Sequence, residues 1–181
     1  MSRNIRLLNA TGLEKSSLES ITVRVARALH CDVRLESYRP DLTRVLDPTR
    51  GQCHSGGLLK EMQDRFNGRG EPNERFAALV DVDLFIPVLT FVFGEAQLDG
   101  KYAVISTYRL KNEFYGIPAD PGRLLERFEK EIVHEAGHVF GLLHCRNFEC
   151  VMRSSTYVEE IDLKRNSLCS DCESIMERKM E

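Results

Sequence analysis

Three histidines and one glutamate lie close together in the last third of this 181-residue sequence. They belong to HEAGHVFGLLHC, which covers residues 134–145. His134 and His138 are four residues apart, so a helix places both imidazoles on one face, one turn apart. Two nitrogens in that arrangement can reach the same ion. The spacing therefore predicts a pair of zinc ligands on one helix.

Glu135 and His144 complete the predicted site. Glu135 is rotated by about 100° from the preceding histidine, so we expect it to reach a water on the metal and not the metal itself. Gly141 can adopt a positive φ and turn the chain, which would return His144 as a third imidazole. Three histidines leave the fourth zinc position open, as in catalytic sites. We therefore predict a zinc-activated water with Glu135 as its general base.

Less specific interpretations of this pattern exist. A lone histidine on a helix is usually a surface or core residue, and H-E-x-x-H alone also occurs outside enzymes. The full string H-E-x-x-H-x-x-G-x-x-H is the signature of the metzincin zinc proteases. From the residues alone, a non-catalytic zinc-stabilised binding module and a zinc hydrolase of a non-peptide amide stay open. Glu135 favours an enzyme, because a structural zinc site needs no adjacent carboxylate.

Four of the six cysteines follow the histidines: Cys145, Cys150, Cys169 and Cys172. Two pairs separated by about twenty residues, one of them C-x-x-C, match a closed four-thiolate zinc site. Such a site has no open position, so we expect a structural role in a segment too short for its own core. Free or disulfide-bonded thiols are the alternative, and disulfides would require an oxidising compartment. Because neighbouring side chains diverge, we expect two zinc ions per chain, one catalytic and one structural.

The composition is that of an ordinary globular domain, with 42% hydrophobic and 29% charged residues. The net charge of -3 provides no basic surface for nucleic acid. We find no apolar run long enough for a signal peptide or a membrane span. We therefore expect a cytoplasmic protein that acts on a peptide or protein, without nucleic-acid or membrane partners. The oligomeric state is not predicted.

Strand and helix patterns alternate ahead of the histidines. Strands are expected over 5–10, 31–38, 77–93 with a break at Pro87, and 101–110, helices over 18–29 and 58–66, and a loop over 41–57. Strands separated by helices favour a parallel sheet, and the turn at Asp99-Gly100 favours one antiparallel strand. The predicted fold class is α/β (α+β), with a mixed, mostly parallel twisted sheet. Residues 101–110 are also a candidate edge for pairing with an extended peptide substrate.

A long helix should carry the first two histidines. Asp120 can cap it and Pro121 suits its first position. Apolar residues then recur at steps of three and four, which predicts a buried stripe. The stripe consists of Leu125, Phe128, Ile132, Ala136, Val139 and Leu143.

HEAGHVFGLLHC, CRNFECVM and CSDC together resemble the archaemetzincins, a family of zinc metalloproteases in the metzincin clan. DLFIP at 83–87, FVFGEA at 91–96 and the segment AVIST-YRL at 103–110 are also similar to family segments. Arg50 and Gln52 in an R-x-Q pattern, with Ser55, form a weaker match. The resemblance extends over nearly the whole chain and is most specific in the C-terminal third.

The resemblance implies roles for particular residues. His134, His138 and His144 would bind the catalytic zinc, with Glu135 as general base. Cys145, Cys150, Cys169 and Cys172 would bind the second zinc. Met152 would be the Met-turn residue, a hydrophobic floor under the catalytic zinc.

The resemblance also implies one metzincin-like catalytic domain over 1–181. Its upper subdomain would cover about 1–141, and its lower subdomain, with the structural zinc, about 142–181. Some metzincins have a tyrosine two residues after the methionine, whereas this chain has Ser154, so that role is not assigned. Endopeptidase and aminopeptidase activity both stay open. An aminopeptidase needs a carboxylate for the free amine, and the candidates are Glu95, Asp99 and Glu131.

Overall fold

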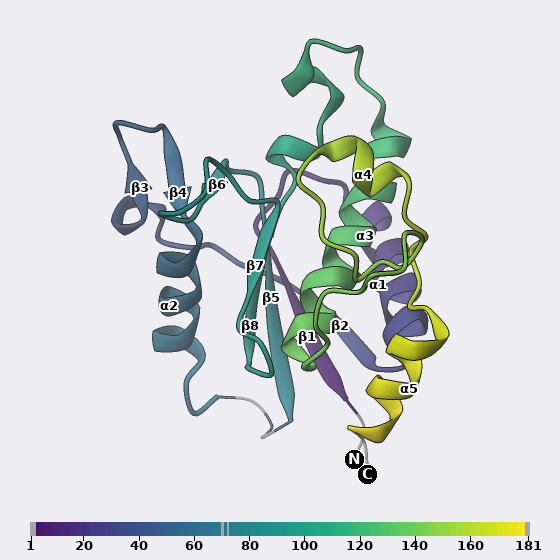
Figure 1. The fold of residues 1–181 in the computed structure, drawn as a ribbon. Helices are drawn as coiled ribbons and strands as arrows, with labels where there is room; N and C mark the ends of the chain where they lie inside the picture. The colour runs from purple at the N-terminus through teal and green to yellow at the C-terminus, as the bar shows by residue number, and fades with distance from the viewer. Residues whose placement is uncertain (1–2, 70, 72, 180–181) are drawn as a thin grey trace.

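A five-stranded sheet forms the centre of the computed structural model, which describes residues 3–69, 71 and 73–179. The strand order is β2-β1-β5-β8-β7 (Figure 1). The strands are β1 (Asn4–Asn9), β2 (Asp32–Ser37), β5 (Glu74–Val80), β7 (Gly94–Ala96) and β8 (Tyr102–Ser106). The first four in this order pair in parallel, and β7 runs antiparallel to β8. The predicted mostly parallel sheet with one antiparallel strand is confirmed.

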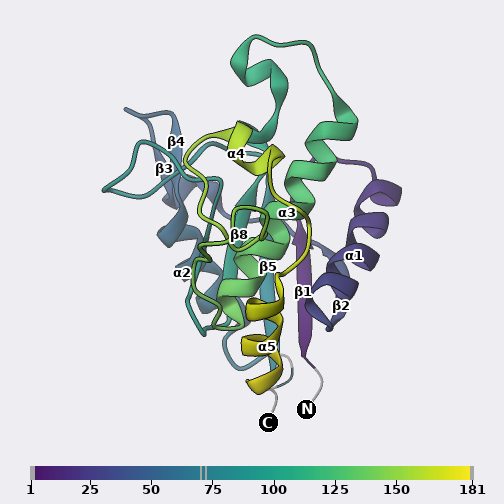
Figure 2. The ribbon, with the colours of Figure 1, turned by 45° about the vertical axis from the view of Figure 1, so that its right-hand side comes forward.

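Helices cover both faces of this sheet. Helices α1 (Lys15–Leu29) and α3 (Pro121–Val139) pack on one face, and α2 (Ser55–Phe66) packs on the other (Figures 1 and 2). Side chains alternate between the two faces along a strand. On β8, Ile105 therefore packs in the core beneath α1 and α3, and Val104 packs in the core beneath α2.

A small second sheet lies beside α2 and corrects one prediction. Its strands are β3 (Leu46–Asp47), β4 (Gln52–His54) and β6 (Leu84–Phe85), in the order β3-β4-β6. The segment 41–57, expected to be a loop, contains η1 (Leu42–Arg44), two of these strands and the start of α2. Strands of two and three residues have no readable period, and β4 is stabilised by pairing with the distant β6.

Helix α3 begins as predicted. The Asp120 side chain accepts a hydrogen bond from the Arg123 N–H at 2.9 Å, and Pro121 is the first helical residue. Two short 3-10 helices, η2 (Tyr108–Leu110) and η3 (Asn112–Tyr115), lie between β8 and α3. They belong to the loop that projects at the top of Figure 1.

The end of α3 corrects the predicted buried stripe. The helix stops at Val139, and Gly141 has a φ of +87°. Leu143 therefore lies beyond the helix and is 67% exposed, whereas Leu142 is buried. Of the other stripe positions, Leu125 is partly buried and the rest are buried: Phe128, Ile132, Ala136 and Val139.

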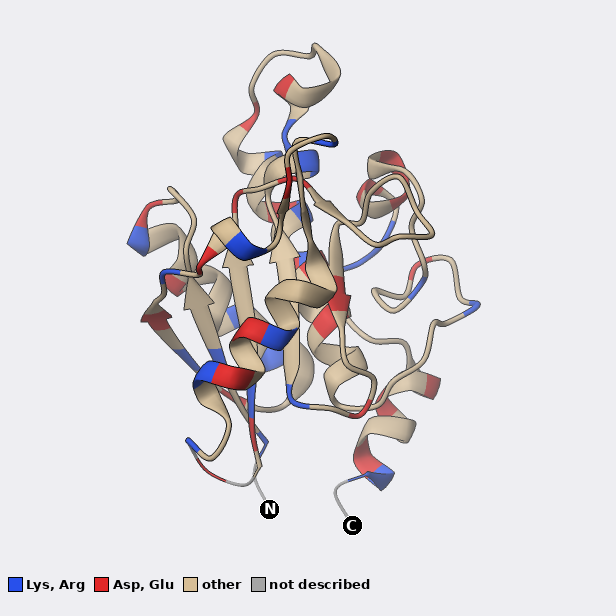
Figure 3. Ribbon diagram, turned by 90° about the vertical axis from the view of Figure 1, so that its left-hand side faces the viewer, with Lys and Arg blue, Asp and Glu red and all other residues tan. Residues whose placement is uncertain are grey.

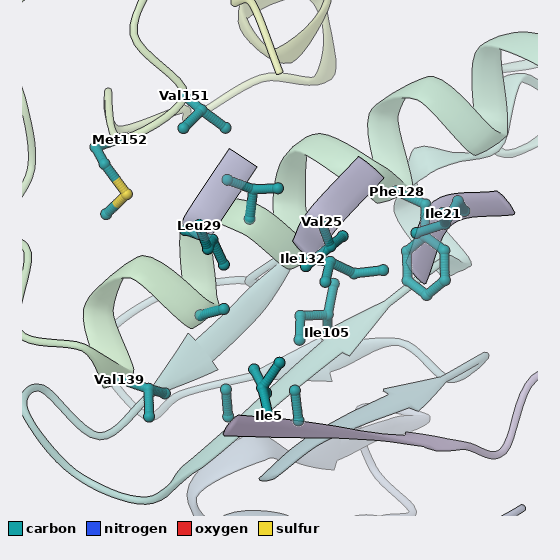
Figure 4. Packing of buried hydrophobic residues seen from close by; sticks show 14 of the residues in the cluster. Ile5, Ile21, Val25, Leu29, Ile105, Phe128, Ile132, Val139, Val151 and Met152 are labelled. Carbon is teal, nitrogen blue, oxygen red and sulfur yellow. The ribbon is translucent and has the colours of Figure 1, made fainter. Parts of the chain in front are cut away.

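The chain after Gly141 packs along α3. It contains α4 (Val158–Asp162) and α5 (Ser170–Arg178) (Figure 2). Arg127 of α3 forms a two-point ion pair with Asp162, each N···O distance being 2.7 Å. Val151 and Met152 lie across α3 from the sheet and belong to the same core (Figure 4). The C-terminal segment therefore shares its core with the rest of the domain.

Basic and acidic residues are interspersed on the side of the molecule that carries α2 (Figure 3). This distribution agrees with the small net charge of -3. None of the helices in the described part of the chain combines the length and the apolar character that a membrane crossing requires.

Candidate metal centres and active-site cleft

The three histidines of the opening motif converge on one point. His134 and His138 lie on the last turns of α3, and His144 returns to them after the turn at Gly141. One ring nitrogen from each lies within 4.8 Å of the others. The structure thus brings together the three imidazoles that the spacing predicted.

Hydrogen bonds determine which nitrogens face that point. The Nδ1 atom of His134 lies 2.8 Å from the Val151 carbonyl oxygen, and Nδ1 of His138 lies 2.7 Å from that of Leu142. Because a carbonyl only accepts, each Nδ1 carries the proton and each Nε2 presents a lone pair. The two Nε2 atoms are 3.1 Å apart. Two facing lone pairs repel at that distance, so the arrangement fits a shared metal ion.

The environment also keeps these imidazoles neutral. Burial lowers the pKa of His134 well below its ordinary value, and it lowers the pKa values of His138 and His144 in the same direction. The positive charge of Lys164 adds to this effect at all three rings. Neutral imidazole is the form that binds a metal ion.

The four C-terminal cysteines form a second cluster. The Sγ atoms of Cys145 and Cys169 are 3.7 Å apart, and those of Cys150 and Cys172 are 3.8 Å apart. A tetrahedral zinc site with Zn–S bonds of about 2.3 Å has S···S edges of about 3.8 Å. A disulfide has an S–S length of about 2 Å, so these pairs are not disulfides. The geometry fits the closed four-thiolate site.

A cleft of about 280 Å³ opens beside the histidines. Its walls come from α3, from the segment before β7 and from the chain after Met152. The lining residues include 89–94, Glu131, His134, Glu135, His144 and 154–156. The predicted base and two of the predicted metal ligands therefore face one cavity.

Glu135 is buried in this cleft against β7. A Cβ atom at Gly94 would lie 2.7 Å from the Glu135 Cγ, so only a glycine leaves room for the carboxylate here. Burial raises the pKa of Glu135 well above its ordinary value, and the negative charges of Glu131 and Glu95 raise it further. The carboxylate is thus a stronger base than an ordinary exposed glutamate.

Met152 lies under the turn of α3 that carries the first two histidines. It is fully buried, and a Cβ atom at Gly137 would lie 2.4 Å from its sulfur. The Cys145 N–H donates to the Met152 carbonyl oxygen at 3.0 Å. The methionine side chain therefore packs against the helix turn of the first two histidines, and its backbone accepts a hydrogen bond from the residue that follows His144.

The wall formed by residues 89–94 is held by a network of residues far apart in the sequence. Asp83 accepts hydrogen bonds from Gln52 at 3.0 Å and from Arg109 at 2.6 and 2.7 Å. Arg50 donates to the carbonyl oxygens of Leu89 and Thr90, both at 3.1 Å. Arg50 and Gln52 belong to the weaker of the sequence matches, and no local spacing connects them to Asp83 or Arg109.

The prediction that residues 101–110 form the edge for the substrate was wrong. Residues 101–110 contain β8, which pairs with β5 on one side and with β7 on the other. The free edge next to the cleft is therefore β7. Sequence patterns identify strands but not their order in a sheet, and the short β7 has no strong pattern of its own.

The three candidate carboxylates for binding a free amine lie in different places. Glu95 accepts a hydrogen bond from the Ser55 hydroxyl at the start of α2, and Asp99 forms an ion pair with Lys179 at 3.5 Å. Of the three, Glu131 lines the cleft.

The two histidines and two cysteines outside the clusters have local structural roles. His54 caps α2, where its Nδ1 accepts from the Gly57 N–H at 3.0 Å. His30 ends α1 with a positive φ. Cys31 packs against the core, and Cys53, which was expected in a loop, is buried in β4.

Known proteins resemble this chain in sequence. The model of Peptidase family M54 matches residues 56–178. The archaemetzincin of Thermococcus kodakarensis is 35% identical over 165 residues, which is 91% of this chain and 83% of the relative. That of Methanocaldococcus jannaschii is 41% identical over 124 residues, 68% of this chain and 65% of the relative.

Solved structures agree with these relatives. The crystal structure of archaemetzincin from Methanopyrus kandleri superposes with a TM-score of 0.83 at 31% identity, covering 99% of this chain and 96% of that one. A zinc-dependent peptidase from Methanocorpusculum labreanum gives the same TM-score at 28% identity, covering 95% and 99%. The chain therefore belongs to the archaemetzincins of peptidase family M54 and is a zinc metallopeptidase.

Proposed function

We propose that the chain hydrolyses peptide bonds in the cleft beside α3, with His134, His138 and His144 holding the catalytic zinc and Glu135 acting as general base. The convergence of three neutral imidazoles and one buried carboxylate on one cavity carries this proposal. The carbonyl oxygens of Val151 and Leu142 support it, because each accepts from the Nδ1 of one histidine and so fixes the tautomer that metal binding requires.

A zinc ion with three histidine ligands supplies Lewis acidity to water and to the scissile carbonyl. Glu135 accepts the proton of the attacking water and then passes it to the leaving amine. The raised pKa of this carboxylate suits the first step, because a raised pKa makes it a stronger base toward the attacking water than an ordinary glutamate.

A second, structural zinc is the other part of the proposal. Cys145, Cys150, Cys169 and Cys172 would supply its four thiolates, which gives two ions per chain. The backbone hydrogen bond from Cys145 to Met152 supports a structural role, because it ties the thiolate cluster to the methionine that packs against the helix turn of His134 and His138. His144 is the residue next to Cys145, so a fixed thiolate cluster also fixes the third histidine.

The domain would then consist of the two predicted subdomains, about 1–141 and about 142–181. The sheet and the three long helices form the upper part. The segment after Gly141 forms the lower part, and its residues 154–156 line the cleft together with 89–94. The substrate would lie between these two walls.

The free edge of β7 provides backbone groups for a peptide. Phe93 accepts from Ser106, and Gln97 donates to Tyr102, so the odd-numbered residues face β8. Alternation in an antiparallel pair then directs the N–H and C=O groups of Gly94 and Ala96 to the free side. An extended peptide would add here as a further strand, next to Glu135.

Replacement of the base tests the mechanism. Glu135→Gln should lower the hydrolysis of a peptide library by about a thousandfold, the usual scale for a general base, while zinc content is unchanged. Glu126→Gln, at an exposed position of the same helix, is the matched control and should retain activity. Full activity in Glu135→Gln would show that another group takes the proton.

A further inference from the structure

Glu131 is a buried carboxylate beside the proposed catalytic site that has no role in the proposed mechanism. It lies on α3, nearly one turn before His134, and is 3% exposed. It lines the same cleft as Phe91, Phe93 and Ser155. A substrate residue next to the scissile bond would therefore meet it.

Protein groups leave Glu131 short of hydrogen-bond donors. Its nearest cation is Lys164, whose Nζ lies 3.8 Å from Oε1, beyond hydrogen-bond distance. Within the described part of the chain, Glu131 Oε1, Lys164 Nζ and Ser155 Oγ are buried and have no hydrogen-bond partner. Two of these three residues, Glu131 and Ser155, face the cleft.

A second buried carboxylate on the same helix shows the contrast. Glu129 is 4% exposed, close to the value for Glu131. It accepts hydrogen bonds from Arg24 and, at 2.7 Å, from Asn166. Buried polar atoms in native proteins normally have a hydrogen-bond partner, and an atom such as Glu131 Oε1 that has none calls for an explanation. A donor from a bound molecule would explain Glu131.

We propose that the cleft selects peptides in which the residue next to the scissile bond ends in a hydrogen-bond donor. The Glu131 carboxylate and the Ser155 hydroxyl oxygen accept from that N–H or O–H group, and Phe91 and Phe93 pack along the stem of the side chain. This inference rests on the proposed function and names its substrate class.

Lys164 sets the charge at this end of the cleft. The lysine is 4% exposed and partly offsets the negative charge of Glu131. The substrate side chain therefore needs a hydrogen-bond donor, which an amide, a hydroxyl or an ammonium group can supply. Probes that carry a neutral donor or a charged donor distinguish these groups.

Three peptidic hydroxamates provide the test. They are identical except for the side chain nearest the hydroxamate, which is glutamine, lysine or leucine. Their Kd values are measured by calorimetry on the zinc-loaded protein, so that the readout is binding and not turnover. The comparison variant is Glu131→Leu with Lys164→Met, because removing both members of a buried pair avoids leaving an unpaired charge.

The wild-type protein should bind the glutamine or the lysine probe about tenfold or more tightly than the leucine probe, the scale of one hydrogen bond to a charged group. The double variant should prefer leucine. Tightest binding of leucine to the wild type, or the same order in both proteins, would overturn the inference alone. If none of the probes binds the zinc-loaded protein, the proposed peptidase site fails as well.

Discussion

The histidine cluster and the cysteine cluster lie next to each other in the sequence, at His144 and Cys145, yet they differ in how their ligands are supplied. Two histidines come from one helix, and the third follows a glycine turn. The cysteines come from two segments, 145–150 and 169–172, that only the fold brings together. The histidine site faces a cleft and has a carboxylate beside it, whereas four thiolates complete a zinc shell.

The difference in ligand number would let two sites for the same ion serve separate purposes. In the proposed function, three ligands would leave a position for chemistry, and the buried Glu135 would supply the proton transfer. Four ligands would leave none, so the energy of binding would go into folding. The hydrogen bond between Cys145 and Met152 would then make the structural site a support for the catalytic one.

Loss of one thiolate should have the largest effect on stability. Cys150→Ala removes a buried ligand, so the structural zinc should be lost and the free energy of unfolding should fall by about 4 kcal/mol or more. Activity should fall too, because Cys145 follows His144 directly and because the Val151 carbonyl oxygen fixes the ring of His134. Thermal unfolding and zinc analysis measure both effects. Cys31→Ala is the control, and a Cys150→Ala protein that keeps two zinc ions would contradict the assignment.

A methyl group added at Gly137, next to Met152, should have an intermediate effect on stability. Gly137→Ala would place a Cβ 2.4 Å from the Met152 sulfur, which must then move. Overpacking of this kind costs about 1–3 kcal/mol, which chemical denaturation can measure. Gly122→Ala, where the nearest atom would be 3.5 Å away, is the control. Equal stability of the two variants would mean that Met152 is not tightly packed.

Lowering the pH should have the smallest effect on stability, and Glu135 contributes to this effect in the opposite direction to the histidines. In the metal-free protein the pKa values of the three histidines are lowered from 6.5, so their contribution to stability is present above that pH and is lost as the pH falls. The pKa of Glu135 is raised from 4.5, so its contribution increases as the pH falls. Metal-free Glu135→Gln should therefore lose more stability than the metal-free wild type between about pH 7 and pH 5.

Urea unfolding of both metal-free proteins across this range provides the measurement. The difference between the two slopes isolates Glu135, since the histidines and Glu131 are common to both. Parallel pH profiles would contradict a raised pKa for this carboxylate.

Local patterns predicted much of this molecule. The strands and helices of the main layers were predicted because each has a period long enough to read. Both clusters were found because their ligands have fixed spacings within short segments. Asp120 and Pro121 marked the start of α3 for the same local reason.

Features that depend on distant contacts were missed. The small sheet rests on pairing between β4 and β6, and the order of β8 and β7 cannot be read from either strand. Leu143 was misplaced because the turn at Gly141 ends the helical period. The network that holds the cleft wall joins Arg50, Asp83 and Arg109 from three separate segments, so no local spacing indicates it.

Metal content per chain, measured by elemental analysis on the wild type, His138→Ala and Cys150→Ala, tests the central claim most directly. Two zinc ions in the wild type are expected. His138→Ala should keep the structural ion and lose peptide hydrolysis with little loss of stability, whereas Cys150→Ala should lose the structural ion and unfold more easily. One zinc in the wild type, or the loss of both ions from His138→Ala, would contradict two sites with separate purposes.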